Sequence, residues 1–238
     1  MIVLPTHVQL GDNAITSLPD AEMSSANTAF SGLKLLDLRN NDCKSLVFES
    51  GGLWTLTTLT SLNFSGNENL ASIDDEGLGN LKALLEFDLS HTNCHNLPSS
   101  ISGCSSLIKL QMTHCPRLVA LPESLGALGA SLKTLSVGHC GLRSLPRSIG
   151  GLSSLTTLDV NHNRIVDKLP DGLSSLERLV ELNVSSNRIA HCPAIPRSPA
   201  LLRLFLGHNR FVSVSGPEIL LAAPNVQELL LNNNLIGG

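Results

Sequence analysis

The sequence predicts an α/β solenoid, a curved horseshoe with a parallel β-sheet on its concave face and short helices, 3-10 turns and loops on its convex face. Three observations lead to this prediction. One apolar pattern recurs every 22 to 28 residues along nearly the whole chain. Aromatic residues are only 3% of the chain against 42% hydrophobic residues, so the core must be built from aliphatic side chains. A polar or small residue follows each apolar stretch at a constant place.

The repeating unit reads L-x-x-L-x-L-x-x-(N/C/T)-x-(L/I/C/F). Its alternate leucines suit a short strand that points them to one side, and one repeat cannot bury this apolar side without its neighbours. We therefore predict a single domain over residues 1–238 with about nine to ten repeats, of which residues 1–32 form an irregular first one. After a partial copy at Val8–Ile15, full copies begin at Leu33, Leu59, Leu84, Leu107, Leu132, Leu155, Leu179, Leu201 and Val226.

The ninth residue of each repeat should lie inside the turn that follows the strand. Its side chain can satisfy backbone groups that no strand pairs with. Asn serves best because its amide both donates and accepts, while Cys and Thr are smaller substitutes. This predicts a structural ladder through the stack. Its members are Asn13, Asn41, Asn67, Thr92, Cys115, Cys140, Asn163, Asn187, Asn209 and Asn234.

A second signature, L-P-x-x-(I/L), follows four of the strands and begins at Leu97, Leu121, Leu145 and Leu169. Proline fixes its own backbone angle and donates no hydrogen bond, so it should end the turn and precede a short helix on the convex side. The stretch 191–199 holds three prolines and should be extended instead.

The Leu-Pro form resembles the intracellular leucine-rich repeats of the Ras-suppressor (Shoc2) type, which plant Ras-group proteins share. The copies at Asn67–Leu70 and Cys115–Leu118 carry an extra turn residue and resemble the looser repeats of plant immune-receptor arrays. The resemblance covers about residues 7–238. It implies a role in signalling or assembly, for example of a small GTPase or phosphatase complex. The Gly before Ile-Pro of receptor-type repeats and the flanking cysteine caps of extracellular members are missing here.

Composition and charge exclude several other classes. Charged residues make up 15% of the chain, the net charge is -4, and no basic cluster suggests nucleic acid as a partner. No apolar run approaches the ~18 residues of a membrane span, and the start of the chain lacks the features of a signal peptide. The six cysteines fit free thiols, since Cys43 and Cys94 occupy the buried eleventh position. A cytoplasmic protein is the resulting expectation.

The last copy stops in mid-repeat at 232–238. Terminal repeats normally carry a polar cap. We therefore expect further sequence or a partner to cover the last strand.

Function is expected on the concave face, at the third, fifth, seventh and eighth residues of each copy. The chain has no G-x-S-x-G elbow, phosphate loop, H-E-x-x-H or dinucleotide fingerprint, so we predict no enzyme and no cofactor. A protein partner should dock there through mainly polar contacts around residues 86–208. The expected contact residues are Asp88, His91, Gln111, His114, His139, Asp159, His162, Asn183, Arg203, Phe205, His208 and Leu230.

Histidines recur at the eighth position, and the first four, from His91 to His162, should stack because neighbouring strands lie ~4.8 Å apart. One interpretation is a metal site or a pH-sensitive rim, and the other is a position that tolerates any small polar residue. No carboxylate or thiolate completes a ligand set, so we predict no metal. Phe205 and Leu230, with Arg203 beside them, are either a binding hot spot or a contact for further C-terminal sequence.

The leading hypothesis is a protein-binding scaffold or adaptor in intracellular signalling or complex assembly. One alternative is a structural subunit of a large assembly, such as a ciliary or cytoskeletal one. Another is the substrate-recognition arm of a longer enzyme, such as a ubiquitin ligase or a kinase.

Overall fold

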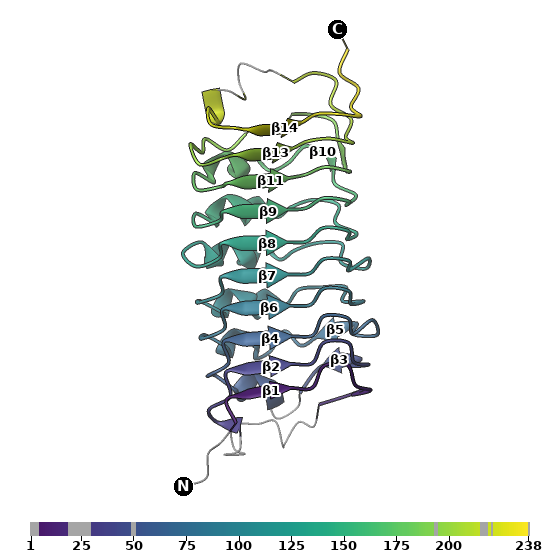
Figure 1. Cartoon of the computed structure of the whole chain (residues 1–238), viewed down its shortest axis with the longest axis vertical. Helices are drawn as coiled ribbons and strands as arrows, with labels where there is room; N and C mark the ends of the chain where they lie inside the picture. The colour runs from purple at the N-terminus through teal and green to yellow at the C-terminus, as the bar shows by residue number, and fades with distance from the viewer. Residues whose placement is uncertain are drawn as a thin grey trace.

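Ten short parallel strands run in one sheet along the length of the molecule, stacked in chain order (Figure 1). This arrangement comes from a computed structural model, which describes residues 5–18, 30–48, 51–192, 195–214, 219 and 221–237. The solenoid that the repeat pattern predicts is confirmed. In order, the strands of this sheet are β1 (His7–Gln9), β2 (Leu35–Asp37), β4 (Ser61–Asn63), β6 (Glu86–Asp88), β7 (Lys109–Gln111), β8 (Thr134–Ser136), β9 (Thr157–Asp159), β11 (Glu181–Asn183), β13 (Arg203–Phe205) and β14 (Glu228–Leu230).

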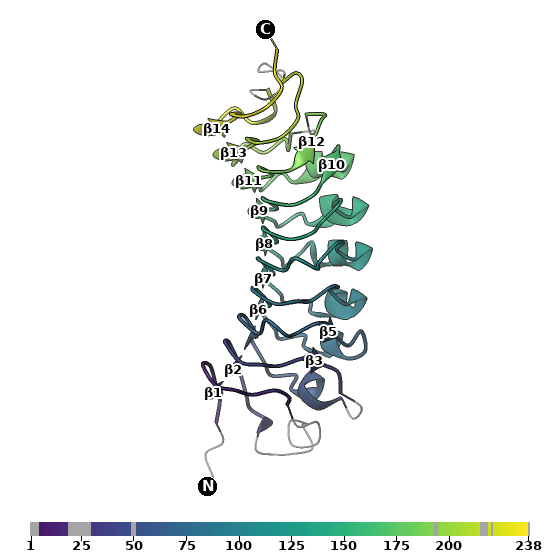
Figure 2. The same cartoon turned by 90° about the vertical axis from the view of Figure 1, so that its right-hand side faces the viewer.

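Every strand covers the third to fifth residues of its repeat and pairs in register with the next one. Leu158 of β9, for example, lies between Leu135 of β8 and Leu182 of β11. From β2 to β13 these central residues are buried in the core, whereas Val8 of β1 is half-buried and Leu229 of β14 is 39% exposed. The third and fifth residues point outward. Figure 2 shows the strands on the concave side of the stack and the helices on the opposite side.

The convex side carries 3-10 helices. Pro98, Pro122, Pro146 and Pro170 each precede one of them, η4 to η7, as the Leu-Pro signature predicts. Residues 195–199 of the proline-rich stretch contain no helix, and residues 193–194 lie outside the described part. The 3-10 helices whose bounds lie within the described residues are η2 (Gly52–Thr55), η3 (Leu78–Asn80), η4 (Ser99–Gly103), η5 (Glu123–Leu128), η6 (Arg147–Gly151) and η7 (Asp171–Ser175).

Between the two sides, the turns pair into two small parallel sheets. One joins β3 (Ser45–Leu46) to β5 (Ser72–Ile73), and the other joins β10 (Val166–Asp167) to β12 (Arg188–Ile189). They extend the repeat-to-repeat pairing beyond the main sheet.

Glycine allows the convex helices to approach closely. A Cβ atom on Gly103 of η4 would lie 2.5 Å from the carbonyl oxygen of Gly79 in η3, and one on Gly150 of η6 would lie 2.4 Å from that of Gly172 in η7. Both distances are shorter than any tolerated contact. The backbones of successive convex helices therefore pack directly against each other.

One aliphatic core runs through the stack. Its largest side chain, Trp54 of η2, is fully buried and meets Phe48 edge to face at 5.6 Å between ring centroids. Cys43, Cys94, Cys104, Cys115 and Cys140 are buried and have free thiols, as the sequence predicts. Burial raises the pKa of Cys104 to about 12, so this thiol stays protonated and donates to the Leu78 carbonyl at 3.3 Å.

Candidate partner-binding surface

The asparagines of the ladder tie each repeat to the one before it. Oδ1 of Asn163 accepts the backbone N–H of Leu142 at 3.0 Å, and its Nδ2 donates to the carbonyls of Val137 at 2.8 Å and Val160 at 3.0 Å. The two outer partners, Leu142 and Val137, belong to the preceding repeat. Equivalent bonds occur at Asn41, Asn67, Asn187, Asn209 and Asn234.

Thr92, Cys115 and Cys140 interrupt this pattern in the middle of the stack. Their side chains donate to carbonyls, as Cys140 does to Met112 at 3.0 Å, but none of them accepts a backbone N–H. The extra turn residue explains two of the three. It lets the N–H of Leu70 bond to the Asn67 carbonyl and that of Leu118 to the Cys115 carbonyl, each within its own turn. Thr92 and Cys140 belong to the repeats that follow these two turns. They therefore have no unpaired N–H of the preceding turn to accept.

The eighth residue of every repeat has a left-handed backbone. Nine of these ten residues are not glycine, and their φ angles lie between 48° and 59°, while Gly66 has a φ of 74°. Neither interpretation made from the sequence, a metal-binding or pH-sensitive rim or a position that tolerates any small polar residue, includes this backbone requirement. The signal was present, because Asp, Asn, Gly, His and Ser fill the column, and Asn, Asp and His are the non-glycine residues that tolerate this conformation best. The members are Asp12, Asn40, Gly66, His91, His114, His139, His162, Ser186, His208 and Asn233.

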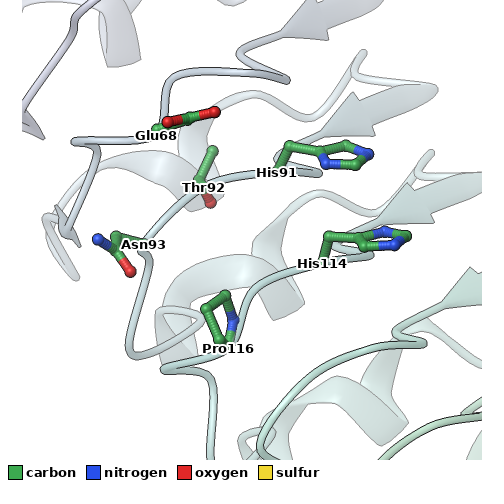
Figure 3. Close-up of a pocket in the computed structure, with 6 residues that line it drawn as sticks. All are labelled: Glu68, His91, Thr92, Asn93, His114 and Pro116. Atoms are coloured by element: carbon green, nitrogen blue, oxygen red, sulfur yellow. The ribbon is translucent and has the colours of Figure 1, made fainter.

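Four of the histidines form a stack. The rings of His91, His114, His139 and His162 lie 4.2–4.3 Å apart between centroids, with interplanar angles of 7–13°. Figure 3 shows the first two rings parallel to each other at the rim of a pocket. Ser186 separates His208 from this stack. The His208 ring contacts the side-chain amides of Asn232 and Asn233 instead.

The stack is poorly shaped for a metal ion. Nitrogen lone pairs lie in the ring plane, so parallel rings direct them along parallel lines rather than toward one point. Within the described residues, no group of three or more His, Cys, Asp or Glu side chains is placed to hold a metal. Partial burial, and then the neighbouring imidazoles, lower the pKa of His114 and His139. Both rings are therefore neutral at pH 7.

A substitution at His139 should show how much stability depends on a residue that tolerates a positive φ angle in this turn. We expect His139→Val to lower the free energy of unfolding by about 1–2 kcal/mol, because a β-branched residue is strained at positive φ. His139→Asn should be nearly neutral, since Asn adopts this conformation readily. Urea unfolding of both variants measures the difference. Equal losses would show that the ring, and not the backbone angle, matters for stability.

The fifth residue has a local role that the sequence analysis missed. Where it is Asp or Asn, its Oδ1 accepts the backbone N–H of the seventh residue, at 2.8 Å from Asp88 to Ser90 and at 3.0 Å from Asp159 to Asn161. Asn183 does the same for Ser185 at 3.1 Å. These three residues, which we expected to contact a partner, therefore also close the turn after their strand.

The seventh position faces solvent less than expected. Ser90, Gly138 and Gly207 are buried at this position, so the expectation that the seventh residue lies open on the concave face is wrong for these three repeats. The physical reason is the approach of the next turn, shown by the N–H of Thr113, which donates to Oγ of Ser90 at 3.2 Å. The third and fifth columns are thus the main outward surface of the sheet.

The last three strands carry a different surface. Arg203 donates from Nε and Nη2 to the same Glu181 oxygen, at 2.8 and 2.7 Å. Phe205 is half-buried, and Leu230 is 45% exposed. They line a hollow of about 370 Å³ on β11, β13 and β14.

One strand per repeat, a buried hydrogen-bond ladder and an open sheet face define a repeat solenoid of the interaction type. A family model described as leucine rich repeat matches residues 57–116 and 130–189, about half of the chain. The chain therefore belongs to the leucine-rich-repeat family, whose domains are in general non-catalytic modules for protein–protein interaction. No curated protein sequence matches it.

Solved structures agree on the fold. A leucine-rich-repeat protein of Leptospira interrogans is 26% identical with a TM-score of 0.75, and the match covers 87% of this chain and 51% of that one. The ectodomain of the Arabidopsis thaliana receptor kinase GASSHO1/SCHENGEN3, solved with CASPARIAN STRIP INTEGRITY FACTOR 2, is 25% identical with a TM-score of 0.66, covering 85% and 24%. The Arabidopsis receptor kinase HAESA, solved with the peptide hormone IDA and the co-receptor SERK1, is 23% identical with a TM-score of 0.78, covering 96% and 38%.

The chain thus spans about half or less of the length of these three structures. Among the described residues, none of the helices has the length and apolar character that crossing a membrane requires.

Proposed function

We propose that this chain is a binding module or adaptor that docks a protein partner on the concave sheet. The observation that supports the proposal is the outward surface formed by the third and fifth columns. Side chains such as Lys109, Gln111 and Ser136 point out of the sheet and make no hydrogen bond or ion pair in the part of the chain that the structure describes. The core and the ladder do not need these side chains, so they are free to meet a partner.

We further propose a cytoplasmic role in signalling or complex assembly, of the Ras-suppressor (Shoc2) type. The five buried free cysteines support it, because reducing compartments keep thiols unpaired. The Leu-Pro signature, which begins η4 to η7, is the feature shared with that type.

The test is affinity capture from the cells that make the protein, followed by mass spectrometry. Gln111→Arg with Ser136→Arg places two bulky charges in the middle of the sheet face. We expect these to weaken capture of the partner at least about tenfold, in line with changes at the centre of an interface. Asp159 is left unchanged because it closes its own turn.

The matched control is Ser105→Arg with Ala130→Arg, two exposed residues outside the sheet. It should retain every partner, and circular dichroism should show that all variants fold alike. Partners kept by the sheet variant but lost from the control would place the docking surface elsewhere and overturn the proposal.

A further inference from the structure

The hollow on the last three strands combines two apolar side chains with an open floor. Phe205 and Leu230 are opposite each other in neighbouring parallel strands, and Asn183 occupies the same position on the other side of Phe205. In all the other described strands of the main sheet, the fifth residue is polar. Gly207, which packs against Asn232 so closely that a Cβ atom would lie 2.7 Å from Oδ1 of Asn232, lines the same hollow of about 370 Å³. The hollow can therefore accept one large apolar side chain.

The walls of the hollow are held by their own hydrogen bonds. Oδ1 of Asn183 accepts from Oγ of Ser185 at 2.6 Å, and the His208 ring lies 3.0 Å from Nδ2 of Asn233. The Nδ2 group of Asn183 makes no hydrogen bond within the described part of the chain, so it remains a donor for a ligand carbonyl. The site is thus largely formed before anything binds, which lowers the entropic cost of binding.

The charge beside the hollow is negative. Glu181, Arg203 and Glu228 are neighbours across the strands at the third position. Glu181 neutralises Arg203 at 2.7 Å, whereas Glu228 forms no ion pair among the residues that the structure describes. Asp159, one strand further, adds a second carboxylate. An uncompensated carboxylate next to an apolar hollow complements a ligand that carries a cation next to an apolar group.

We propose that this hollow captures an extended basic and apolar segment of a protein partner, an inference that rests on the proposed function. A side chain of the size of Leu or Phe packs against Phe205 and Leu230, and a Lys or Arg one or two residues away faces Glu228. The third and fifth positions of a strand are roughly 7 Å apart, which is also the spacing of alternate residues in an extended peptide.

The experiment is selection of binders from a random dodecapeptide display library on the immobilised full chain, followed by affinity measurement of synthetic copies. Selected peptides should place Lys or Arg within two residues of a large apolar residue. Phe205→Ser with Leu230→Ser should weaken them at least about tenfold. Glu228→Gln should weaken them about threefold to tenfold at low salt and much less at high salt, because screening removes the charge contribution.

Val119→Ser with Val166→Ser is the control, since both valines are exposed and lie outside the main ten-stranded sheet. It should leave the affinity unchanged. Peptides that resist the Phe205/Leu230 and Glu228 variants but are lost with Gln111→Arg and Ser136→Arg would overturn this inference and leave the proposed function standing. Acidic or uncharged selected peptides would overturn it as well. If no peptide is selected, or if binding is insensitive to every sheet variant, the inference fails, while affinity capture still decides the proposed function separately.

Discussion

Asn163→Ala should lower the free energy of unfolding by about 3–5 kcal/mol. Asn163 is buried and holds the N–H of Leu142 and the carbonyls of Val137 and Val160. Each buried backbone group that loses its partner costs about 1–3 kcal/mol, and alanine can replace none of these bonds. Urea unfolding followed by circular dichroism measures the loss as a lower midpoint with an unchanged slope.

Asn13→Ala is the matched control, because Asn13 has the same repeat position but is exposed. Its amide donates to the carbonyls of Leu10 and Gly11 in its own repeat, where water can replace it. We expect a loss below about 1 kcal/mol. Similar losses for the two variants would mean that bonds between repeats add nothing beyond those within a turn.

Gly103→Ala should be the next most damaging change, with a loss of about 2–3 kcal/mol. The added methyl group would meet the oxygen, Cα and carbonyl carbon of Gly79 at 2.5–2.9 Å, and these are backbone atoms that no side-chain rotation can move. Helices η3 and η4 would have to separate. Thermal unfolding should show a lower melting temperature for this variant.

Gly32→Ala serves as its control, since a Cβ atom there would have no neighbour within 4 Å. This change should be neutral or stabilise by up to about 1 kcal/mol, because alanine restricts the unfolded chain. A neutral result for Gly103→Ala would show that the convex helices can shift apart without loss, which would contradict direct backbone packing.

The repeat period is what made the fold predictable. Strand positions, inward leucines and ninth-position residues all follow from one pattern. The stack from His91 to His162 follows as well, because side chains at the same position of parallel strands lie one strand spacing apart. The convex segments were predictable as short helices, 3-10 turns or loops, but the sequence did not decide between these forms. Their 3-10 form depends on close packing between repeats, which a single repeat does not reveal.

Less of the candidate surface could be predicted, because one residue type can have two roles. Asp88 and Asp159 have the composition of a polar docking surface, yet their carboxylates also close a local turn. The residue types at the eighth position indicate a positive φ angle. The same types also fit a position that simply prefers polar residues, so the sequence did not separate the two explanations. The hollow at Phe205 is lined by residues from three neighbouring strands, so only the stacked structure shows it.

The left-handed turn also limits which residue types the molecule can present to a partner. Along the eighth column, backbone geometry admits little beyond Asn, Asp, Gly, His and Ser, whichever partner binds. Fifth-position residues such as Asp88 are constrained in turn by the bond that they accept. Substitutions that adapt the surface to new partners are therefore expected in the third column. They are also expected at fifth positions whose side chain does not accept the N–H of the seventh residue, as at Phe205 and Leu230. A family of such chains could change what it binds there while its outline stays the same.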